Sequence, residues 1–169
     1  MGFIRNMTCR RRATVLMPTI RKFIVKGDKV LDVGCDTGTM SLEVKRGTGC
    51  LLDCTDFTNV LKHPLPFIDK PEMGKYDKVL LIDVLHHIIE SEQVNVVKYW
   101  ERFGKVIIID TEPTMTAYLV DLFNEVGGMP TPYTFRTLEG WELALPDYKI
   151  EKVKTSRLYP LKHLIMVQK

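Results

Sequence analysis

The sequence predicts an α/β fold, in which helices cover a doubly wound, mostly parallel β-sheet. Four short runs rich in β-branched residues or leucine alternate along the chain with segments of helical periodicity. The second, third and fourth runs each close on an aspartate, and continuous apolar runs of this kind are typical of parallel strands buried on both faces. Two strand-like runs near residue 160 are separated by too few residues for a crossover helix, so they predict an antiparallel pair.

The individual elements follow from the same patterns. A helical apolar repeat over residues 13–24 contains Pro18, which is expected to kink or restart the helix. The helix predicted over residues 113–126 begins at a proline and stops at Gly127-Gly128, as helices commonly do. The remaining predicted helices span residues 39–46 and 91–103, and the predicted strands span residues 29–34, 49–53, 76–83, 104–110, 148–159 and 162–169.

Length and composition predict one cytoplasmic domain. The chain has 169 residues, of which 45% are hydrophobic, which is enough for one sizeable core. No apolar run is long enough for a membrane helix or a signal peptide, so no membrane partner is expected. The four cysteines lack paired spacing, which indicates a reducing compartment. Cys50, Cys54 and His63 could surround a metal, but such cysteines are more often core residues, and we predict no metal.

The charge of the chain is unevenly distributed. Residues 1–29 contain eight basic side chains and one acidic side chain, a net charge of +7, whereas the whole chain carries +3. An excess of this kind suits a polyanion such as RNA, and the alternative is a solvated helix face. We therefore expect the acceptor side of any site to include Arg12.

The stretch VLDVGCDTG, residues 30–38, ends a strand in a turn with two glycines, which could serve either close ligand approach or the turn geometry itself. Ligands of open parallel sheets bind outside the carboxyl ends of the strands. Asp53 closes the second predicted strand 21 residues after Asp32, where a carboxylate could accept hydrogen bonds from ribose hydroxyls. Asp36 in the turn would repel a pyrophosphate, whereas nearby acids suit the protonated amine of a sulfonium amino acid. The pattern favours S-adenosylmethionine over NAD.

Three motifs together resemble those of class I S-adenosylmethionine-dependent methyltransferases. VLDVGCDTG is similar to the first motif of that family, with Asp36 where a glycine is usual. YDKVLLIDVLHHI resembles the fourth-strand motif, and RTLEGWELAL followed by YKIEKV resembles the late helix and sixth strand. The resemblance covers roughly residues 10–169 and implies a seven-stranded sheet with an antiparallel last strand. It also implies one methyltransferase domain over residues 1–169, with a basic helical segment at 1–28, a cofactor-binding half at 29–110 and a substrate-side half at 111–169.

The resemblance assigns roles to individual residues. Asp32 would serve the amine of S-adenosyl-L-methionine, and Asp53 would serve its ribose. Only 24 residues lie from Asp53 to Asp77, so the second helix and third strand must be short. PFIDK is a candidate for that strand, which would make Asp69 the acceptor for the adenine amine, with Asp56 as the alternative. The remaining expected cofactor contacts are Gly34, Cys35, Gly38, Asp83, Val84 and Leu85.

Methyl transfer to an oxygen or nitrogen can use a base, and His86 and His87 follow the fourth-strand motif. One of the two histidines is expected to be structural. The segment 111–136 is the expected acceptor wall, and its candidate substrate residues are Asp110 at the edge, Tyr133 and Arg136. The motifs of base and cap-ribose methyltransferases are missing. The charge pattern slightly favours RNA as acceptor; the alternatives are a small molecule, or a non-catalytic interaction module.

Overall fold

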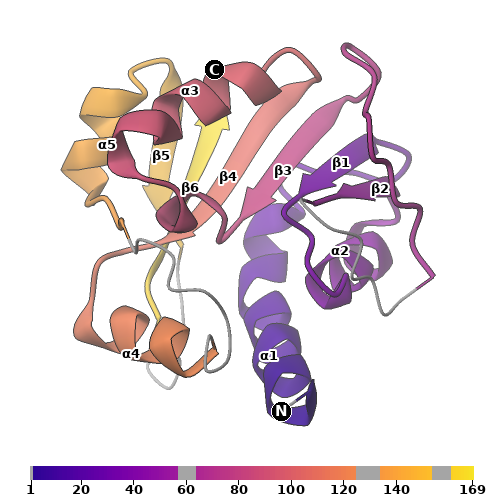
Figure 1. Ribbon diagram of the computed structural model, residues 1–169. Helices are drawn as coiled ribbons and strands as arrows, with labels where there is room; N and C mark the ends of the chain where they lie inside the picture. The colour runs from indigo at the N-terminus through magenta and orange to yellow at the C-terminus, as the bar shows by residue number, and fades with distance from the viewer. Residues whose placement is uncertain (1, 57–63, 125–133, 154–160) are drawn as a thin grey trace.

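A computed structural model describes residues 2–56, 64–124, 134–153 and 161–169, and it contains a six-stranded sheet (Figure 1). The strand order is β2-β1-β3-β4-β6-β5, in which β2, β1, β3 and β4 are mutually parallel and β6 runs antiparallel to both of its neighbours. The predicted α/β fold with one antiparallel strand is therefore confirmed. The strands are β1 (Lys29–Val33), β2 (Leu51–Thr55), β3 (Lys78–Ile82), β4 (Lys105–Thr111), β5 (Tyr148–Lys152) and β6 (His163–Gln168).

Helices cover both faces of the sheet. The face that carries Val30 and Leu80 packs against Leu16 and Ile20, whereas the face that carries Leu31 packs against the helices that follow β3. Glycines flank the second helix at both of its ends, because Gly38 and Gly49 adopt the left-handed conformation there. The helices are α1 (Gly2–Ile20), α2 (Thr39–Thr48), the short 3₁₀ helix η1 (Leu85–His87), α3 (Glu90–Trp100), α4 (Met115–Asn124) and α5 (Leu138–Ala144).

The helices differ from the prediction mainly at their ends. The first helix, α1, begins at Gly2, well before the apolar repeat, and Pro18 lies in its last turn. In the described part of the chain, no helix combines the length and the hydropathy needed to cross a bilayer. The predicted stop at Gly127-Gly128 lies outside the described residues.

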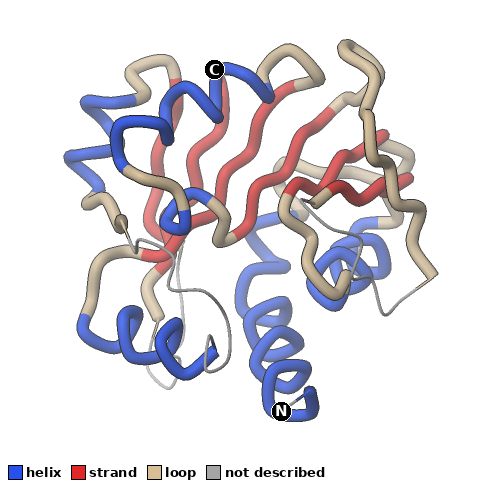
Figure 2. The backbone as a smooth tube through the Cα atoms, viewed as in Figure 1, coloured by secondary structure: helices blue, strands red, loops and turns tan. Residues whose placement is uncertain are grey.

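The expected seventh strand is reduced to a single residue pair. Phe67, in the PFIDK stretch, forms an isolated parallel bridge with Cys54, supported by hydrogen bonds to the Cys54 backbone on both sides. Residues 64–77 form no helix before β3 begins (Figure 2). The seven-stranded prediction is therefore not confirmed, since the described residues form six strands and this single bridge.

Strand β2 also ends later than expected. Its pairing with β1 continues to Val33↔Thr55, so the strand closes two residues after Asp53. Asp53 faces Leu31 in the middle of the strand and accepts a hydrogen bond from Tyr76 Oη at 3.2 Å. The residue that follows the strand end is Asp56, and this shift changes which carboxylate reaches the edge of the sheet.

Candidate functional site

The turn after β1 uses positive φ at three positions. Gly34, Asp36 and Gly38 have φ of 74°, 48° and 76°. Aspartate tolerates this region better than most residues, so Asp36 can stand where the resembling family has glycine. A Cβ at Gly34 would lie 2.6 Å from Val84 Cγ2, so the turn packs directly against the segment that follows β3. Glycine is therefore required at position 34 by both backbone conformation and space.

Asp32 lies behind this turn as a buried carboxyl group. Its side chain is 3% exposed, and Ser41 Oγ donates a hydrogen bond to Asp32 Oδ2 at 2.5 Å. Burial raises the pKa of Asp32 to about 7, with a smaller contribution from the nearby charge of Asp56, while the Ser41 hydrogen bond opposes the shift. Asp32 is thus poised to ionise when a cation binds beside it.

Cys35, the residue after Gly34, is buried and contacts Cys54. A hydrogen bond with the Cys54 thiol, together with burial, raises the pKa of the Cys35 thiol. Cys50 and Cys54 are also buried in the core, as the sequence indicated, whereas His63 lies outside the described residues. These cysteines therefore serve as packing groups in the core.

Asp56 is held at the edge of the sheet by the turn. The backbone N–H of Asp36 donates to Asp56 Oδ2 at 2.6 Å, and Gly34 N donates to Thr55 O at 2.9 Å. These hydrogen bonds join the end of β2 to the glycine turn. A ligand that contacts the turn would therefore also meet the carboxylate of Asp56. Asp53, which the sequence indicated for this position, is three residues away on the face of the sheet.

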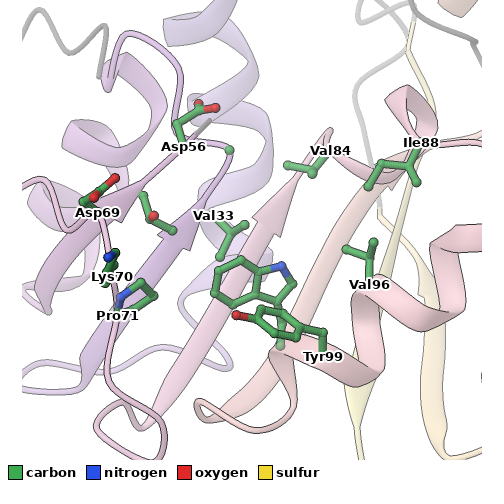
Figure 3. Close-up of a pocket in the computed structure, with 12 residues that line it drawn as sticks. Val33, Asp56, Asp69, Lys70, Pro71, Val84, Ile88, Val96 and Tyr99 are labelled. Atoms are coloured by element: carbon green, nitrogen blue, oxygen red, sulfur yellow. The ribbon is translucent and has the colours of Figure 1, made fainter. Parts of the chain in front are cut away.

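A cavity of about 480 Å³ begins at this edge. Figure 3 shows Asp56, Asp69, Lys70 and Pro71 on one side of it, and Val84 and Ile88 on the other. The remaining lining residues are Val33, Gly34, Thr55, Val96, Tyr99 and Trp100. Of the carboxylates indicated by the sequence, Asp56 and Asp69 therefore face one cavity, while Asp53 is not among its lining residues.

A second cluster surrounds Asp83 at the end of β3. Arg12 Nη1 from α1 contacts Asp83 Oδ2 at 2.5 Å, and Thr111 Oγ1 donates to Asp83 Oδ1 at 2.9 Å. Burial would raise the pKa of Asp83, but the Arg12 charge, assisted by the neighbouring histidines and the Thr111 hydrogen bond, lowers it to about 2. The positive charge of Arg12 is thus neutralised inside the protein, and Asp83 itself has φ of 54°.

His86 and Asp110 form a buried pair beside Asp83. His86 Nδ1 lies 2.5 Å from Asp110 Oδ1, and the backbone N–H of His86 donates to Asp110 Oδ2 at 3.2 Å. Asp110 therefore holds both the ring and the backbone of His86. The ring of His87 lies 4.2 Å from that of His86, and His87 is partly exposed. The predicted histidines and Asp110 are thus brought together in one cluster.

Phe135 and Gln93 close this cluster from the other side. The Phe135 ring stacks on His86 with centroids 4.7 Å apart. The buried Gln93 donates from Nε2 to the backbone oxygens of Leu85 and Thr134 at 2.9 and 2.7 Å. Gln93 thereby fastens η1 to the segment that carries Phe135, a role that no local sequence pattern indicated.

Arg136, which the sequence indicated as a substrate residue, supports this arrangement. Its Nε donates to Gln93 Oε1 at 2.7 Å, its Nη2 donates to Glu90 O at 2.8 Å, and its guanidinium lies over the Trp141 ring. These contacts engage its side chain within the protein. The role of Arg136 in substrate binding stays a prediction, and Tyr133 lies outside the described residues.

Among the described residues, Asp83, His86 and Asp110 form one group whose ligand atoms, within 4.8 Å of each other, could in principle hold a metal ion. Two of these atoms are joined by the hydrogen bond between His86 and Asp110, and Asp83 is paired with Arg12. A metal ion would have to displace both contacts. The geometry suits a histidine–carboxylate dyad better than a metal centre.

No protein-family model and no curated protein sequence matches the chain. Among solved structures, the chain is similar to magnesium protoporphyrin IX methyltransferase (ChlM) from Synechocystis PCC 6803 with bound SAH, at 18% identity and a TM-score of 0.66. That match covers 98% of this chain and 84% of that one. The PH0226 protein from Pyrococcus horikoshii OT3 matches at 20% identity and a TM-score of 0.65, covering 94% and 90% of the two chains. The chain therefore has the fold of the class I S-adenosylmethionine-dependent methyltransferases.

Proposed function

We propose that this protein is a methyltransferase that uses S-adenosylmethionine, and that the Asp56 end of the cavity receives the nucleoside part of the cofactor. The observation that carries the proposal is the carboxylate of Asp56, which the glycine turn holds at the carboxyl edge of the sheet. A carboxylate there suits a ribose diol, and Asp69 in the same cavity suits the adenine amine. The ChlM structures with bound SAH and SAM support the choice of cofactor for this fold.

The amino-acid end of the cofactor fits the other half of the site. Asp32 lies behind the Gly34 turn and is the candidate partner of the protonated amine, because Asp83 is already paired with Arg12. Because Asp32 has a pKa near 7, a bound cation would favour its ionised form. The cofactor supplies a methyl group on positively charged sulfur, so the protein mainly has to align the acceptor and exclude water.

His86 is our candidate for the group that accepts a proton from the acceptor. Asp110 fixes Nδ1 as the donating nitrogen, which leaves Nε2 as the basic nitrogen of the ring. His86 is 2% exposed and its ring stacks on Phe135, so an acceptor reaches it only after a local rearrangement of the groups that cover it. His87, which is partly exposed, is the second candidate.

We propose a small molecule as the acceptor. Arg12, one of three consecutive arginines that suggested RNA, is paired with Asp83, so its charge is not offered to phosphates. The His86–Asp110 dyad is buried, with the Phe135 ring stacked on His86, and so deep a position suits a compact acceptor better than a polymer.

RNA is the second candidate, and the exposed Arg10 and Arg11 favour it. Retention of an RNA pool that falls linearly with the logarithm of salt concentration, at about −0.7 per phosphate, would support this candidate. Salt-independent or absent retention would exclude it.

Titration calorimetry with S-adenosylhomocysteine and with NAD tests the cofactor. We expect the homocysteine derivative to bind more tightly, and Asp56→Ala to weaken its binding by about 1.5–3 kcal/mol, because hydrogen bonds to a charged acceptor are the stronger kind. Asp53→Ala is the matched control and should change the affinity less than about twofold, because Asp53 does not line the cavity. Tighter binding of NAD would overturn the assignment. If a folded sample bound neither ligand, a non-catalytic module would become the leading interpretation.

A further inference from the structure

The cavity has a second half that the proposed cofactor contacts do not use. Away from Asp56, its walls are Val96, Tyr99 and Trp100 of α3 and Pro71 of the opposite loop. The Tyr99 and Trp100 rings meet edge to face at 5.1 Å, and Tyr99 is 49% exposed. The cavity thus changes from a carboxylate-lined end to an aromatic end.

The aromatic half lies between α3 and the loop that carries Lys70 and Pro71. The described residues 64–77, which include this loop, form loop and turn and no helix before β3, as Figure 2 shows. The cavity extends from this loop and α3 to the edge of the sheet where Asp56 lies.

We propose that this aromatic half is a subsite for a flat apolar group attached to the amino edge of the cofactor's adenine. The inference rests on the proposed function. If the ribose meets Asp56 and the adenine amine meets Asp69, the amine lies beside Lys70 and Pro71, which continue the same wall toward Trp100. An aromatic ring on that amine would enter the space lined by Tyr99 and Trp100 and could stack on the indole.

The volume supports a ligand larger than the nucleoside edge alone. At about 480 Å³ the cavity lies within the range of about 300–1,000 Å³ that is usual for sites of drug-sized ligands. The walls of the aromatic half are mostly apolar, and their polar groups are the Tyr99 hydroxyl, the Trp100 indole N–H and the exposed Lys70 side chain. An apolar substituent would therefore be desolvated mainly against apolar surface.

The test compares S-adenosylhomocysteine with its analogue that carries a benzyl group on the adenine amine. We expect the analogue to bind the wild-type protein within about threefold of the parent or more tightly, and to quench tryptophan fluorescence more strongly. The chain has two tryptophans, and Trp141 is 1% exposed in the core, so the quenching should report on Trp100. Trp100→Phe should remove most of the quenching.

A matched pair of variants on α3 separates the subsite from the cofactor site. Val96→Trp fills the aromatic half. It should lower the affinity for the benzyl analogue at least tenfold, while the affinity for S-adenosylhomocysteine changes less than threefold. Asn95→Trp places the same ring on an exposed position of the helix outside the cavity and should change neither ligand. If the wild-type protein bound S-adenosylhomocysteine but bound the benzyl analogue more than about twentyfold more weakly, the subsite would be overturned and the proposed function would stand. Failure of the parent itself to bind would overturn both.

Discussion

The buried carboxyl of Asp32 should make the stability of the protein fall as pH rises. Its pKa of about 7 lies about three units above the ordinary value of 3.8. Between these two values the folded protein holds a proton that the unfolded chain has released, so the free energy of unfolding decreases with pH and levels off above about 7. At about 1.36 kcal/mol per unit, the full penalty is about 4 kcal/mol, of which about 1 kcal/mol is already present at pH 4.5.

Asp32→Asn removes the ionisable group and should remove this penalty. Relative to wild type, the variant should gain about 3 kcal/mol more stability at pH 8 than at pH 4.5, less any loss of its hydrogen bond with Ser41 that is common to both pH values. Ser41→Ala removes the bond that favours the ionised form, so it should steepen the fall of stability with pH. Urea denaturation at pH 4.5, 6 and 8 measures these differences. A difference between wild type and Asp32→Asn that stays constant within about 0.5 kcal/mol would refute the reasoning.

Three further predictions concern buried contacts and backbone conformation. Arg12→Met leaves a buried carboxylate without its cation and should cost about 3 kcal/mol in urea denaturation at pH 7, whereas Arg10→Ala, on an exposed position of the same helix, should cost under about 0.5 kcal/mol. Gly34→Ala combines positive φ with a clash at 2.6 Å, so it should cost at least about 1 kcal/mol more than Gly27→Ala, where φ is also positive but the space is open. Gln93→Leu strands several buried backbone oxygens and should lower the free energy of unfolding by at least about 2 kcal/mol; a loss below about 0.5 kcal/mol would show that these bonds are replaced by water.

Much of the sheet could be predicted because its strands are buried on both faces. The four parallel strands and the antiparallel pair follow from local runs of apolar residues and from the distance between them. The end of β2 could not be predicted in the same way, because pairing with Val33 of β1 extends the strand through Thr55. Because the strand ends at Thr55 and not at Asp53, Asp56 is the first residue beyond it, so a small error in a strand boundary changed the candidate ribose ligand.

The candidate site was predicted only where its residues follow a strand end. The turn after β1 and the histidines after β3 were found from sequence, since each belongs to one short motif. The partners Arg12 and Gln93 were not identified as such, because their contacts join segments far apart along the chain. The contacts of Arg136 could not be predicted for the same reason, because a charged residue in an expected acceptor wall gives no local sign that Gln93 and Trp141 contact it.

The insertion of β6 between β4 and β5 has a consequence for the order of events during folding. Strand β5 precedes β6 along the chain, yet in the sheet it pairs with β6 and does not pair with β4. Until β6 docks, β5 has no partner in the sheet and β4 presents an open strand edge, which can pair with other chains. The sheet can therefore be completed only when its antiparallel strand inserts between two strands that precede it, and slow docking of β6 would prolong an aggregation-prone state.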